Sequence, residues 1–172
     1  MINLLGTNPT QLLGMIAFTA ATVACLVAAY RPTARDRRAW MVLALINGVF
    51  LMEVFFGFRH RIHDMAQSIL IAQGTYGDRA SLQRVLVPVV VLLAFGLAFF
   101  VVWSRFTNVD FKLAASTSIA ILALFAIEAV SLHSLDALLY QPIGPALLVG
   151  WIWIVACILT VSASFREKYS QN

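Results

Sequence analysis

Charged side chains are scarce in this sequence. Only 12% of the 172 residues are Asp, Glu, Lys or Arg, whereas soluble domains contain about 25%. A chain so poor in charge cannot cover a water-facing surface, and 61% of its residues are hydrophobic. The composition therefore excludes an ordinary soluble domain and predicts a protein that is solvated by the lipid bilayer.

Cysteine is also scarce, since only Cys25 and Cys157 are present and both lie within apolar runs. Two isolated cysteines exclude a disulfide framework and a zinc knuckle. The sequence also lacks a basic stripe with interleaved aromatic residues, although its net charge is +4, so nucleic acid is not an expected partner. A basic excess is instead typical of membrane proteins, which retain Lys and Arg in cytoplasmic loops.

Long apolar runs dominate what remains. A helix needs about 20 apolar residues to cross a bilayer, and an alternating barrel pattern is absent. The fold class predicted for residues 1–172 is therefore a single all-α domain, a polytopic integral membrane bundle. The expected transmembrane helices cover residues 11–30, 39–58, 85–104, 113–132 (extending to 140) and 143–163.

The basic residues predict the orientation of these five helices. With the N-terminus outside and the C-terminus inside, eight basic residues fall on the cytoplasmic side and four outside. The eight are Arg31, Arg35, Arg37, Arg38, Arg105, Lys112, Arg166 and Lys168, and the four are Arg59, Arg61, Arg79 and Arg84. We expect Trp40 and Trp103 at the inner interface, and a bacterial inner membrane as the location.

One longer connection separates the second and third helices. Its residues 61–74 carry Ile62, Met65 and Ile69 at helical spacing and predict an interfacial amphipathic helix. Ser81 is the expected cap of the next helix. Tyr76 and Arg79 are candidates for a lid over a nearby site, and an ordered polar loop is the alternative.

All three histidines and four of the eight acidic residues fall in two short stretches. On the predicted topology these stretches are the outer ends of the second and fourth helices, which run in the same direction. The first contains Glu53, His60, His63 and Asp64, and the second contains Glu128, His133 and Asp136. Each helix would thus present a carboxylate, then a histidine, then a second ligand three residues later.

Helical angles make the first stretch the better ligand face. At about 100° per residue, Glu53 and His60 lie about 20° apart on one continuous helix, whereas Glu128 and His133 lie about 140° apart. Carboxylates inside a bilayer are costly and are usually paired with cations, protons or metals.

Histidine with Asp and Glu is a ligand set for Fe, Mn, Zn or Cu. The leading hypothesis is a membrane metal-binding protein, redox-active, with its site facing outward. Its predicted ligands are Glu53, His60, His63, Glu128, His133 and Asp136. Asp64 would orient a histidine from behind, and an enzymatic role would be that of a metal-dependent oxidoreductase.

Three other interpretations stay open from the residues alone. The first is an electron carrier with haem b held by His60 or His63 opposite His133, where Gly48 and Gly57 give the ring room. The second is an accessory subunit without a cofactor, which binds a membrane protein partner or a second copy of itself. The third is a structural or proton-handling polar network.

Overall fold

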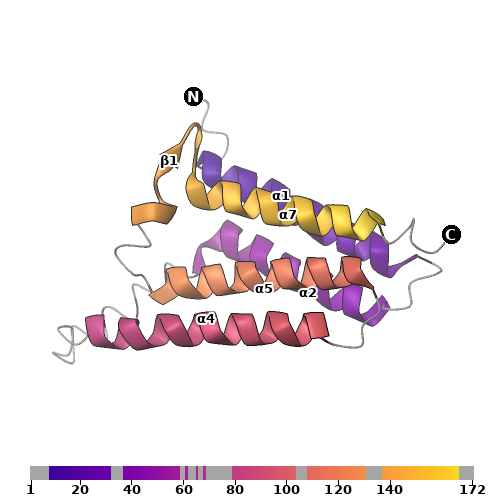
Figure 1. Cartoon of the computed structure of the whole chain (residues 1–172). Coiled ribbons are helices and arrows are strands. Elements are labelled where there is room, and N and C mark those ends of the chain that lie inside the picture. The colour runs from indigo at the N-terminus through magenta and orange to yellow at the C-terminus, as the bar shows by residue number, and fades with distance from the viewer. Residues whose placement is uncertain are drawn as a thin grey trace.

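The structure is a computed structural model. It describes residues 8–31, 37–58, 61, 65, 68, 79–103, 108–130 and 137–166, with backbone alone at 79–84, 102 and 130. The described residues form an all-α bundle with one short β-hairpin (Figure 1), which confirms the predicted fold class.

The bundle contains five long helices. They are α1 (Pro9–Ala29), α2 (Arg37–Phe56), α4 (Arg79–Trp103), α5 (Val109–Val130) and α7 (Leu148–Arg166). Four of these described helices, α1, α2, α5 and α7, are long and apolar enough to cross a membrane. The described apolar segment of α4, Val85–Val101, is shorter.

Asparagine side chains begin two of these helices. Asn8 precedes Pro9 and accepts a hydrogen bond from the Gln11 backbone N–H at 2.7 Å. Asn108 does the same for Asp110 at the start of α5, at 2.9 Å. Such caps satisfy N–H groups that have no partner within the helix, and proline at the first helical position needs no such partner.

Four aromatic side chains, one from each of α1, α2, α5 and α7, form the centre of the core. Phe18, Phe50, Phe125 and Trp153 contact one another with ring centroids 5.3–6.1 Å apart. Near the starts of α2 and α5, the rings of Trp40 and Phe111 meet edge-on, with their centroids 5.5 Å apart. Two ring contacts join α2 and α5, Trp40 with Phe111 early in both helices and Phe50 with Phe125 later in both. The two helices therefore run in the same direction, as predicted.

The helix α4 lies outside this core. Among the long helices it packs chiefly against α5, at the lower edge of the bundle in Figure 1. No described side chain of α4 is fully buried, and Phe95, Phe100 and Trp103 are among the most exposed. In a membrane this apolar face would contact lipid.

Three sequence predictions are wrong in detail. Trp40 is fully buried beside Phe111 and small alanines, so it is a core residue instead of a belt residue. Ser81 lies inside α4, because that helix already includes Arg79. The last helix begins at Leu148 instead of residue 143.

A β-hairpin occupies the residues before Leu148. The strands β1 (Pro142–Ile143) and β2 (Ala146–Leu147) pair antiparallel. The loop between them is Gly144–Pro145, and Gly144 has φ +66°, which glycine at the first position of a type II′ turn adopts at little cost. The Leu147 N–H donates to Thr10 Oγ1 at 2.9 Å and so fixes the hairpin to the start of α1.

Candidate functional site

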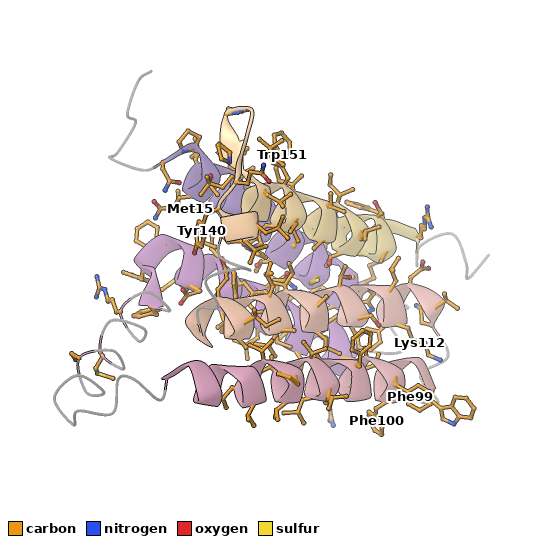
Figure 2. All side chains as sticks on the ribbon, turned by 60° about the vertical axis from the view of Figure 1, so that its left-hand side comes forward. Met15, Phe99, Phe100, Lys112, Tyr140 and Trp151 are labelled. Carbon is orange, nitrogen blue, oxygen red and sulfur yellow. The ribbon has the colours of Figure 1, made fainter. Side chains whose placement is uncertain are left out.

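A polar pocket lies at the hairpin end of the bundle. Its volume is 170 Å³, and its walls come from the start of α1, the end of α2, the start of α7 and the hairpin. The polar side chains that line it are Asn8, Thr10, Gln11, Glu53 and Tyr140. In Figure 2, Tyr140 lies at this end, whereas Lys112 and Phe99 lie at the opposite end of the bundle.

Glu53 lies in the last turn of α2, and Gly57 ends that helix. Gly57 has φ +64°, and its N–H donates to the Glu53 carbonyl at 2.7 Å, which is the left-handed cap common at helix ends. Gln11 Nε2 donates to the carbonyls of Val54 at 3.0 Å and Phe55 at 3.3 Å. The end of α2 is therefore tied to α1, and the half-buried Glu53 of this last turn lines the pocket.

Glu128 lies in the last turn of α5 and is only 7% exposed. Its Oε1 accepts a hydrogen bond from the hydroxyl of Tyr140 at 3.3 Å. Tyr140 itself lines the polar pocket. This tyrosine therefore connects the buried carboxylate of α5 with the pocket that the carboxylate of α2 lines.

Both carboxylates lie at the C-terminal ends of their helices, where the helix dipole is negative. Neither last turn contains a basic residue, although such residues are stabilising there. The helices α1, α4 and α7 begin at this same end of the bundle (Figure 1). Glu53 and Glu128 are the two acidic side chains of the described residues at this end, and carboxylates can bind a metal ion or a proton.

The sequence predicted this convergence only in part. Glu53 and Glu128 lie at the same end of the bundle, as expected. His60, His63, Asp64, Tyr76, His133 and Asp136 lie outside the described residues, and Arg79 is described only by its helical backbone. Among the described residues alone, no group of three His, Cys, Asp or Glu side chains could hold a metal ion.

The predicted common face of Glu53 and His60 stays a prediction, because His60 lies outside the described residues. That angle assumed one continuous helix, but the left-handed Gly57 interrupts it. Helical conformation resumes at Phe58, and the Arg61 N–H bonds to the Gly57 carbonyl at 3.4 Å. Helical conformation is found at Phe58, Arg61, Met65 and Ser68. The last three belong to the segment 61–74, for which the sequence predicts an interfacial helix.

Sequence reasoning missed Gln11 and Tyr140 as site residues. Gln11 is a polar residue beside a helix start, a position that ordinarily indicates solvent contact. Tyr140 precedes Pro142 and read as the end of a helix. The signal that could have found Tyr140 is its separation in sequence from Glu128. Only twelve residues separate the two, and so short a separation allows their side chains to meet.

The fold and this pocket define a class, a helical bundle of membrane-protein type with a carboxylate-containing pocket at one end. Comparison of the chain with protein-family models, curated proteins and solved structures gives no match.

Proposed function

We propose that this chain is an integral membrane protein that binds a redox-active transition metal ion at the hairpin end of its bundle. The observation that carries the proposal is the convergence of Glu53, which lines the polar pocket, and Glu128, which Tyr140 links to it. Two carboxylates at helix C-terminal ends attract a cation, and Fe, Mn, Cu and Zn all accept carboxylate and imidazole ligands.

The histidines complete the proposed ligand set. His60 and His63 follow α2 in the chain, and His133 and Asp136 follow α5, so both pairs begin within a few residues of this end. Asp64 is the proposed partner that orients a histidine. A site of this composition would serve a metal-dependent oxidoreductase of the membrane.

The proposed orientation has the pocket outside, as in a bacterial inner membrane protein with N-out and C-in. Support comes from the basic residues of the described chain. Five lie at or beside the helix ends opposite the pocket, namely Arg31, Arg37, Arg38, Lys112 and Arg166, whereas Arg61, Arg79 and Arg84 follow or begin helices at the pocket end.

The test is elemental analysis with an absorption spectrum of the full chain in mild detergent. His60→Ala and His133→Ala are compared with the wild type, and Asp110→Asn, an acidic residue at the opposite end of α5, is the control. Near-stoichiometric iron, copper or manganese that falls in both histidine variants alone supports the proposal, whereas zinc would support the metal site and refute its redox role. A Soret band would assign haem b instead, and absence of metal and chromophore in folded wild type would refute both.

A further inference from the structure

A groove on the outer face of α1 and α2 leads to Glu53. Its volume is 540 Å³, within the range of about 300–1,000 Å³ of small-molecule sites. It extends along α2 from Met41, near the start of that helix, to Phe58 beyond its end. Gly48 opens the groove, because a Cβ built there would meet no heavy atom within 4 Å.

Glu53 lines both this apolar groove and the polar pocket. Among the described residues that line the groove, it is the one titratable side chain, and the others are apolar except Thr22. A second groove of 600 Å³, between α1 and α7, has no titratable side chain in its described lining. The groove thus combines a long apolar wall with one carboxylate, that of Glu53, near the hairpin end of the bundle.

We propose that this groove binds a membrane-soluble hydroquinone, with its apolar tail along α2 and one hydroxyl donating a hydrogen bond to the Glu53 carboxylate. This inference rests on the proposed function, for which it names the substrate class. A hydrogen bond from a hydroxyl to a carboxylate is about twice as strong as a neutral one. The polar pocket beyond Glu53 offers 170 Å³ for the head of the molecule.

The depth of Glu53 favours a neutral head over the charged head of a phospholipid. Glu53 lies four residues before Gly57, so it is about 6 Å inside the end of α2. A zwitterionic head would lose its hydration at that depth, which is costly. A hydroquinone head carries no charge and needs only one acceptor to satisfy each hydroxyl.

The test measures binding of a decyl-tailed hydroquinone to the full chain in phosphatidylcholine nanodiscs, both as purified and after removal of metal by a chelator. Two substitutions of glycine by leucine serve as the test and its control. Gly48→Leu fills the groove, whereas Gly96→Leu fills equally open space on α4, where a Cβ also meets nothing within 4 Å. Glu53→Leu removes the acceptor and keeps the bulk of the side chain.

We expect the dissociation constant of the hydroquinone to rise about tenfold or more in Glu53→Leu, because the loss of a hydrogen bond to a charged group weakens binding by at least about that factor. Gly48→Leu should raise it similarly by occupying the groove, and Gly96→Leu should leave it unchanged. If Gly48→Leu does not fold, Leu45→Trp narrows the groove from an exposed position. Equal binding in all variants, or equal loss in Gly96→Leu, overturns the inference.

Two further outcomes separate this inference from the proposed function. Hydroquinone binding with the expected variant pattern, in protein that never contains metal, would refute the metal site and retain the groove assignment. Stoichiometric metal without hydroquinone binding would retain the metal site and refute the groove assignment. Displacement of the hydroquinone by added phosphatidylethanolamine would assign the groove to a phospholipid and overturn the inference.

Discussion

The two carboxylates at the pocket end, Glu53 and Glu128, differ in how deeply they are buried. Glu128 is buried in the last turn of an apolar helix, where a carboxylate loses hydration and also faces the negative end of the helix dipole. The hydroxyl of Tyr140 compensates part of this cost. Glu53 is half-buried and has the polar lining of the pocket around it.

Replacement of Tyr140 by Phe should destabilise the protein through Glu128. Loss of the hydroxyl removes one hydrogen bond to the carboxylate, and we expect the free energy of unfolding to fall by about 1 kcal/mol. Reversible unfolding in detergent measures this difference. The control is Tyr30→Phe, because that exposed ring keeps its contact with the Arg37 guanidinium at 5.0 Å. Equal stability of the two variants would contradict the account.

Gly14 of α1 shows how closely α2 and α7 approach this helix near the pocket. A Cβ at Gly14 would lie 2.7 Å from Cε3 of Trp153 and 3.0 Å from Cγ1 of Val54. The indole cannot move aside, because Phe18 and Phe125 pack against it. We therefore expect Gly14→Ala to lower the free energy of unfolding by about 1–3 kcal/mol, as overpacking does.

The matched control for Gly14→Ala is Gly96→Ala. Open space surrounds Gly96, so alanine should be neutral or stabilise the helix by up to about 1 kcal/mol. Unfolding curves of both variants in the same detergent decide the matter. A stabilised Gly14→Ala would mean that Trp153 and α1 are farther apart than the structure has them.

The residue types of the site could be predicted from the sequence, but the direction in which each side chain points could not. Lone carboxylates in apolar runs drew attention to Glu53 and Glu128 because they are costly in lipid. Trp40 illustrates what fails, since a tryptophan near a basic segment looks like a belt residue. Whether it points toward lipid or toward Phe111 depends on packing partners far away in the sequence.

Helices and their ends decide how the pocket forms. The element α2 was predictable from its apolar run, but its end was not, because Gly57 and Gly48 look alike in the sequence. Only Gly57 adopts the left-handed conformation. The hairpin before α7 was missed because its strands have two residues each, too few for an alternating pattern.

Substitution of Gly57 tests the importance of this helix end. The left-handed conformation costs an L-residue about 1–2 kcal/mol, so Gly57→Ala should lower the free energy of unfolding by that amount. Gly48→Ala is the control within the same helix, since its surroundings are open. Thermal or denaturant unfolding of the two variants gives the comparison. No difference between them would indicate that α2 continues through residue 57.

The whole molecule is a bundle in which neighbouring helices along the chain alternate in direction. Helices α1, α4 and α7 run away from the hairpin end, and α2 and α5 run toward it (Figure 1). This alternation follows from short connections between apolar runs, which is why it was predictable. The peripheral position of α4 was not, because its composition resembles that of the other four helices.

Labelling with a membrane-impermeable maleimide tests the proposed orientation. Ser68→Cys, beyond α2 on the pocket side, should react in intact cells, whereas Arg38→Cys near the start of α2 should react only after permeabilisation. The native Cys25 and Cys157 are buried and should give little background. The reverse pattern would place the pocket in the cytoplasm.

The central claim is that Glu53 and Glu128 act on one metal ion. The most direct measurement is the dissociation constant of the metal in wild type, Glu53→Gln, Glu128→Gln and the double variant. If both carboxylates serve one ion, each single variant should weaken binding and the two losses should not add, since residues at one site couple by about 0.5–3 kcal/mol. Unchanged affinity in either single variant, or losses that simply add, would contradict the account.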